Sequence, residues 1–126
     1  MNNKINGSGL KRIYKAFKCS ILGLKAAYVF EAAFRQELLL CIILLPFSFI
    51  ISSTLSEWLM LVCSLLFLLF SEIINSAIEA LADQISLEHH ELIGRAKDLG
   101  SASVFVAMVT VMLVWLVVTY SFIKSI

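Results

Sequence analysis

The stretch LGSASVFVAMVTVMLVWLVVTYSFI, from Leu99 to Ile123, contains no charged residue. An α-helix rises about 1.5 Å per residue, so roughly 20 apolar residues cross the hydrocarbon core of a bilayer. The stretch LLLCIILLPFSFIISSTLS, from Leu38 to Ser56, is also uncharged, and Pro46 would at most kink a helix there. Both stretches are long enough to span a membrane on their own.

A third uncharged stretch, from Trp58 to Ser71, is too short to cross a bilayer alone. It becomes long enough if it continues through 73–78 and accepts Glu72, and with it Glu79, inside the membrane or at its edge. A backbone within lipid must satisfy its own hydrogen bonds, so these segments should be helices. The sequence therefore predicts three transmembrane helices, over about 32–51, 58–82 and 99–122.

The composition of the 126-residue chain agrees with this prediction. Hydrophobic residues make up 60% of it and charged residues 15%, whereas a soluble domain is about half apolar and a quarter charged. This excludes a water-soluble globule and a disordered chain, and three cysteines are too few for a disulfide-stapled secreted domain. No internal repeat or linker is visible, so we expect residues 1–126 to form a single all-α membrane domain.

The N-terminal segment has a basic and amphipathic pattern. Apolar residues between Leu10 and Tyr28 recur mostly at three- and four-residue steps, as on one face of a helix. We predict a surface helix over about 8–30 that lies on an anionic membrane. A signal peptide is the alternative, but no apolar run closely follows the first lysines, so we expect the segment to be retained. Its basic residues are Lys4, Lys11, Arg12, Lys15, Lys18 and Lys25.

The positions of Lys and Arg predict the orientation in the membrane. The N-terminal segment is rich in them, the connection 52–57 has none, and the connection 84–98 has Arg95 and Lys97. Lys and Arg concentrate in cytoplasmic connections. We therefore expect a cytoplasmic N-terminus and a C-terminus on the opposite side of the membrane, which would be the periplasmic side in a bacterial inner membrane.

Polar residues form one face of the second predicted span. Glu72, Asn75, Glu79 and Asp83, with Ser76, succeed one another at helical spacing. A carboxylate in or near lipid needs water, a cation or a hydrogen-bond donor. A hard cation such as Mg²⁺ prefers carboxylate oxygens, so this face is a candidate metal site. The alternative is that these groups only hold helices together in an oligomer.

Two further polar clusters flank this face. Where the surface helix meets the first span, Glu31 and Arg35 are four residues apart and could simply pair, with Glu37 close by. The connection 84–98 holds adjacent histidines between acids, which we interpret as a solvated loop rather than a zinc site, because no cysteine lies nearby. This third cluster consists of Glu88, His89, His90, Glu91, Arg95, Lys97 and Asp98.

Three motifs resemble a known family. They are EAAFRQE at Glu31–Glu37, EIINSAIEALAD at Glu72–Asp83 and HELIGRAKDLGSA at His90–Ala102, and they look like the small integral-membrane diacylglycerol kinases of bacteria. The resemblance covers nearly the whole chain. It implies a homotrimeric helix bundle in the inner membrane, with active sites shared between subunits, that transfers the γ-phosphoryl group of ATP to diacylglycerol with Mg²⁺. It implies no nucleic-acid partner.

The resemblance also implies roles for individual residues. Glu72 would be the general base, and Glu31 and Glu79 would hold the metal. His89 and Cys19 stand where aromatic residues are usual, a departure that concerns the packing of the purine and not the phosphate chemistry. The implied ATP-binding residues are Arg12, Cys19, Ser20, Glu31, Asn75, Glu79, Glu88, His89, His90, Lys97 and Asp98. The implied lipid-binding residues are Arg12, Lys25, Arg35, Glu37, Glu72 and Ser101.

Two other functions are kept as alternatives. Relatives with the same core motifs phosphorylate undecaprenol, so a polyprenol kinase is the nearest one. A small ion-coupled transporter subunit would use Glu72 and Glu79 to carry protons or cations, but both acids lie near one end of one helix, and the spans 38–56 and 99–123 offer no charged relay. Phosphoryl transfer needs charge neutralisation, in-line positioning and a base, and these residue types meet that need.

Overall fold

The computed structural model describes residues 9–126, and its regular structure is entirely helical. The helices are α1 (Leu10–Phe30), α2 (Ala32–Ile51), α3 (Leu55–Ile85) and α4 (Glu91–Ser125). Of these, α2, α3 and α4 are long and apolar enough to cross a membrane. This confirms the all-helical class and the three helices of membrane-spanning character. Lys4 and the start of the predicted surface helix at residue 8 lie outside the described residues.

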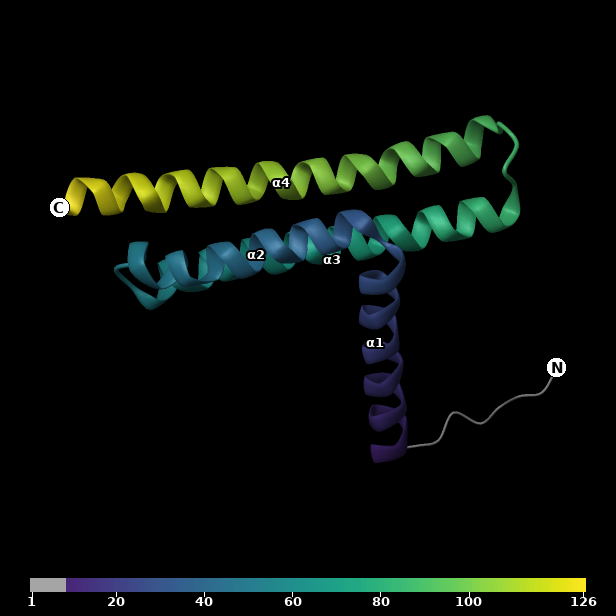
Figure 1. The fold of residues 1–126 in the computed structure, drawn as a ribbon, viewed down its shortest axis with the longest axis horizontal. Coiled ribbons are helices and arrows are strands. Elements are labelled where there is room, and N and C mark those ends of the chain that lie inside the picture. The colour runs from purple at the N-terminus through teal and green to yellow at the C-terminus, as the bar shows by residue number, and fades with distance from the viewer. Residues whose placement is uncertain (1–8) are drawn as a thin grey trace.

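The central element is α3. It packs along α4 over the most extensive helix contact in the described chain, and α2 packs mainly against it from another side. Figure 1 shows these three helices side by side, while α1 leaves the N-terminal end of α2 and projects crosswise. Consequently α3 has the largest buried share of the three long helices.

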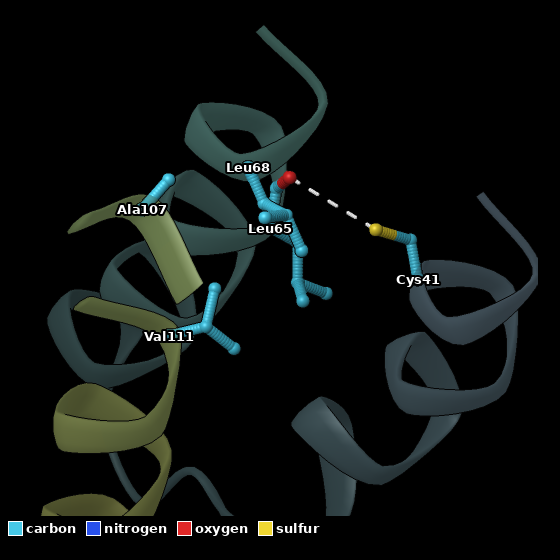
Figure 2. Packing of buried hydrophobic residues seen from close by; sticks show 5 residues of the cluster. All are labelled: Cys41, Leu65, Leu68, Ala107 and Val111. Atoms are coloured by element: carbon cyan, nitrogen blue, oxygen red, sulfur yellow. Dashed lines mark hydrogen bonds between the residues drawn. The ribbon is translucent and has the colours of Figure 1, made fainter. Parts of the chain in front are cut away.

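A small core joins the three long helices. Its buried members are Cys41 from α2, Leu65 and Leu68 from α3, and Ala107 and Val111 from α4. Figure 2 shows them converging, with the Cys41 thiol donating a weak hydrogen bond of 3.9 Å to the Leu65 carbonyl. Ala107 is completely buried, and such small residues let helix backbones approach closely in membrane proteins.

The turn before α3 is fixed by reciprocal capping. The Thr54 hydroxyl accepts a hydrogen bond of 3.2 Å from the Glu57 N–H, and the Glu57 carboxylate accepts one of 2.7 Å from the Ser53 N–H. This arrangement closely follows the capping box, in which a Thr and a Glu three residues later satisfy free N–H groups at a helix start. The helix therefore begins at Leu55, ahead of the predicted span at 58.

The connection between α3 and α4 is shorter than the predicted loop 84–98. Only 86–90 are non-helical, so Arg95, Lys97 and Asp98 lie on α4 and not in a loop. The reason is local: Glu91 lies in the first turn, where an acid favours the helix, and forms a 2.9 Å ion pair with Arg95 one turn later.

Many large apolar side chains point away from the bundle. Phe47 and Phe49 on α2, Phe70 on α3, and Phe105 and Leu116 on α4 are all more than half exposed. Soluble monomers rarely expose large continuous apolar surfaces. Together with the three apolar helices, this surface indicates a multi-pass membrane protein.

Candidate active site

The polar face of α3 is buried against its neighbours. Glu72 is 5% exposed and Asn75 is 7% exposed. The Asn75 amide Nδ2 donates a hydrogen bond of 3.3 Å to Oε1 of Glu79, one helical turn away. The fold therefore brings two of these predicted site residues into direct contact and encloses a third on the same helix.

Glu31 approaches this face because the chain bends there. It lies between α1 and α2 with an extended backbone (φ −107°, ψ 110°), and its N–H still donates to the Ala27 carbonyl at 3.0 Å. The carboxylates of Glu79 and Glu31 are both close enough to act electrostatically on Glu72. The bend therefore brings Glu31 toward the helix that carries Glu72 and Glu79.

Arg35 stabilises the bend instead of pairing with Glu31. Its Nη1 donates to the carbonyl oxygens of Tyr28 at 2.9 Å and Val29 at 3.1 Å. Those carbonyls belong to the last turn of α1, where helix oxygens lack partners within the helix. The simple pair suggested by the four-residue spacing is absent from the described chain, because the helix is interrupted at Glu31.

Several polar atoms around the site are buried without a hydrogen-bond partner in residues 9–126. They include Oε2 of Glu37, Oδ1 of Asn75 and Oγ of Ser76. A buried polar atom without a partner costs roughly 1–3 kcal/mol. These atoms therefore mark places where a group from outside this single chain would be stabilising.

A polar contact that the sequence did not reveal lies beside Glu72. The Ser71 hydroxyl donates to the Ser103 hydroxyl at 3.2 Å, and Ser103 donates to the Gly100 carbonyl at 2.6 Å. This chain of hydrogen bonds ties α3 to α4. Single serines in apolar segments are common, so only the helix pairing identifies them.

The C-terminal part of α3 and the N-terminal part of α4 meet through an ion pair. Lys97 Nζ lies 2.9 Å from Asp83 Oδ1, and both side chains are partly exposed. Lys97 precedes the uncharged stretch 99–123, and its hydrogen bond to Asp83 raises the pKa of its ammonium group. Lys97 is therefore positively charged at neutral pH. The helical spacing predicted Asp83 on the acidic face of α3, but it did not predict the ion pair with Lys97.

A hollow of about 310 Å³ opens beside this ion pair. Glu88, His89, His90 and Lys97, all predicted ATP-binding residues, line it together with Asp83. The Glu88 N–H donates to the Ser86 hydroxyl at 3.0 Å, which shapes the connection. The histidines are exposed, in agreement with a solvated connection.

Other predicted site residues lie apart from the hollow. On α1, Arg12, Cys19, Ser20 and Lys25 are exposed, and the Ser20 hydroxyl donates to the Ala16 carbonyl at 3.0 Å. On α4, Asp98 and Ser101 are exposed as well. Because α1 projects away from the bundle (Figure 1), one chain does not gather the whole predicted nucleotide site.

A second hollow, of about 390 Å³, lies between α1 and α3. Small and apolar residues such as Ala27 and Ala77 make up most of its lining, with Glu31 and Ser76 as its polar members. An apolar hollow with a carboxylate and a hydroxyl group in its lining suits a molecule with a hydrocarbon part and a hydroxyl group.

In the described part of the chain, no three His, Cys, Asp or Glu side chains converge as a metal site.

Comparisons with known proteins agree with the motifs. The family model of prokaryotic diacylglycerol kinase matches residues 18–119. The chain is 44% identical over 108 residues to the diacylglycerol kinase of Haemophilus influenzae, covering 86% of this chain and 92% of that protein. The diacylglycerol kinase of Pseudomonas aeruginosa is 44% identical over 86% of this chain and 88% of its own length. That of Escherichia coli K12 is 40% identical over 92% of this chain and 95% of its own.

Proposed function

The chain belongs to the prokaryotic diacylglycerol kinase family, and we propose that it uses ATP to phosphorylate diacylglycerol to phosphatidic acid at the cytoplasmic face of the inner membrane. The observation that carries this proposal is the buried acidic face of α3. Glu72 lies enclosed beside the Asn75–Glu79 contact, and the Lys97 hollow lies further along the same helix pair. A water-soluble phosphate donor and a lipid acceptor can meet along such a helix.

The two hollows suit the two substrates. ATP is polyanionic, and the hollow between α3 and α4 offers the Lys97 ammonium together with polar groups from the connection. Diacylglycerol is apolar apart from its head, and the hollow between α1 and α3 is mostly apolar, with Glu31 and Ser76 as its polar members. Glu72 belongs to α3, the helix that the two hollows share.

In the proposed reaction, Glu72 accepts the proton of the diacylglycerol hydroxyl. The hydroxyl oxygen then attacks the γ-phosphorus of ATP, and the bond from that phosphorus to the bridging oxygen breaks, which releases ADP. Lys97 would hold the phosphates in line by its charge. A base and positioned positive charge are the main protein contributions that phosphoryl transfer requires.

The residues present fit a magnesium ion. Glu31 and Glu79 supply the carboxylate oxygens that this hard cation prefers, and the Asn75 amide Nδ2 donates to Oε1 of Glu79, which holds that carboxylate in place. One or two protein carboxylates suffice for Mg²⁺, since water and substrate phosphates complete its shell. When bound, the ion would neutralise charge on the transferring phosphoryl group.

We also propose that the enzyme is a homotrimer with active sites shared between subunits. The unpartnered atoms of Glu37 and Ser76 and the exposed apolar faces of α2 and α4 support this assembly. So does the separation of the α1 residues from the hollow, because a neighbouring subunit can bring them to it. In this arrangement α1 is an amphipathic surface helix that lies on the cytoplasmic leaflet, its lysines facing anionic lipid headgroups.

A panel of lipid alcohols tests the proposed function. The purified protein, in mixed micelles with labelled ATP and Mg²⁺, should transfer phosphate to diacylglycerol and lose this activity when the metal is chelated. Undecaprenol in the same assay separates the polyprenol kinase alternative. Transfer to undecaprenol alone would replace the proposed acceptor, and transfer to no lipid alcohol would refute kinase activity on lipids. Ion flux in proteoliposomes without ATP would favour the transporter alternative.

A further inference from the structure

Helix α4 approaches α3 very closely at Gly100, which is buried. A Cβ atom built on Gly100 would collide with the side-chain oxygen Oδ1 of Asn75, and it would contact Ile78 Cδ1 at an ordinary 3.6 Å. The other helical glycines of the described chain, Gly23 and Gly94, have no such atom within 4 Å. Among them, Gly100 is thus the one whose missing side chain leaves room that a neighbouring residue uses.

This room is occupied by a residue of the proposed active site. The amide of Asn75 has its Nδ2 on Glu79 at 3.3 Å and its Oδ1 directed toward Gly100. The two ends of an amide move together, because the group is planar and rigid. A side chain at position 100 that displaces Oδ1 must therefore also move Nδ2 away from Glu79.

The helix itself gains nothing from glycine at this position. Gly100 does not have a positive φ angle, so any residue can adopt its backbone conformation. In a helix interior, alanine is more favourable than glycine. The sequence therefore carries a residue that weakens α4 locally, at the point where α4 faces Asn75.

We propose that Gly100 is a positioning residue of the active site: its lack of a side chain leaves the space that holds the Asn75 amide on Glu79. The proposal rests on the proposed function, in which Glu79 would help to hold the magnesium ion and Asn75 holds the Glu79 carboxylate. Gly100 does not touch the reacting atoms. It acts through Asn75, so the effects of substitutions at positions 100 and 75 should not be additive.

The test is a double-mutant cycle of Gly100→Ala, Asn75→Ala and both together, measured by thermal unfolding in detergent and by kcat and KM for diacylglycerol. Gly94→Ala on the same helix is the stability control, and it should leave the melting temperature unchanged or raise it. Gly100→Ala should lower the melting temperature below that of this control and lower kcat about 10- to 100-fold, the effect of misplacing an active-site group. KM for diacylglycerol should change less than kcat.

In the Asn75→Ala background, the same Gly100→Ala change should lower neither quantity further. The added methyl group then fills space that the amide has vacated, so kcat should differ by less than about twofold between Asn75→Ala and the double variant. A full kcat in Gly100→Ala, or effects on kcat that multiply in the double variant, would overturn the proposal. If Gly100→Ala does not fold, recovery of folding in the double variant supports it, and continued misfolding refutes it.

Failure of the proposed function would look different. The wild-type protein would then transfer no phosphate to diacylglycerol, while the melting temperatures of the four proteins would still report whether residues 100 and 75 compete for one space. Independent melting-temperature effects of Gly100→Ala and Asn75→Ala would refute the contact itself. A coupled cycle together with an inactive wild type would refute only the kinase proposal.

Discussion

Replacing Glu72 by glutamine should separate catalysis from stability. The two side chains have nearly the same shape, and in residues 9–126 no hydrogen bond ends on the Glu72 carboxylate, so Glu72→Gln breaks no contact of this kind. The carboxylates of Glu79 and Glu31 lie near, and a neutral amide removes the repulsion between like charges. We therefore expect the free energy of unfolding to fall by less than about 1 kcal/mol, the value of one hydrogen bond, or to rise.

The activity of the same variant should collapse. A positioned general base contributes about 10²- to 10⁴-fold to a rate, and an amide cannot accept the hydroxyl proton. We expect kcat for diacylglycerol to fall by that factor while KM for ATP changes little, because the Lys97 hollow is left intact. The assay is transfer of labelled phosphate in mixed micelles, with unfolding followed on the same preparation.

Glu57→Gln is the matched control for this prediction. It makes the same change on the same helix, at the opposite end, and glutamine can still accept the hydrogen bond that Glu57 accepts from the Ser53 N–H. Its activity should stay within about twofold of the wild-type value. Wild-type kcat in Glu72→Gln would refute the base assignment, and a large loss of stability in parallel with activity would refute the separation of the two effects.

Three further predictions address phosphate binding and packing. Lys97→Met should raise KM for ATP by roughly tenfold or more, since a charge-assisted contact to phosphate is lost, yet change the melting temperature little, because the ion pair with Asp83 is exposed; an unchanged KM would argue against the phosphate role. Ala107→Leu should cost about 1–3 kcal/mol of stability by overpacking the fully buried contact between α3 and α4, whereas Met108→Leu, at a half-exposed neighbour, should be close to neutral in the same unfolding assay. Thr54→Ala should cost about 0.5–2 kcal/mol by removing the cap of α3, without an effect on kcat measured below the unfolding transition.

The fold could largely be predicted because lipid restricts the choices. Uncharged stretches near 20 residues leave helices as the only spanning structure in a chain with no barrel pattern, and α2, α3 and α4 have that character. The start of α4 could not be predicted in the same way. Glu91 and Arg95 continue the helix into water, where the boundary depends on local ion pairs and capping and not on the bilayer.

The candidate site also has a part that could be predicted from the sequence and a part that could not. The period of α3 places Glu72, Asn75 and Glu79 on one face from sequence alone, because a single helix fixes their relation. Contacts between helices depend on how the elements pack: the Ser71–Ser103 hydrogen bond is one, and the room at Gly100 is another. The sequence contains the residues but not the crossing point of α3 and α4.

The bend at Glu31 decides which groups Arg35 contacts. Spacing alone pairs Glu31 with Arg35, since residues four apart are neighbours on a continuous helix. The helix is interrupted there, so Arg35 instead satisfies the free carbonyls at the end of α1. Residues four apart are neighbours on the surface only where the helix between them is continuous.

The lengths of α3 and α4 have a consequence for the membrane itself. With 31 and 35 residues, they measure about 46 and 52 Å, whereas the hydrocarbon core is about 30 Å thick. Each helix therefore extends well beyond the acyl chains, and the thickness of the bilayer decides which of its turns lie among the headgroups. In a thicker membrane the polar turns around Glu79 would lie closer to the hydrocarbon core, and in a thinner one they would be more exposed to water. The acyl-chain length of the surrounding lipids is thus a physical variable of the site, independent of the lipid that is bound there.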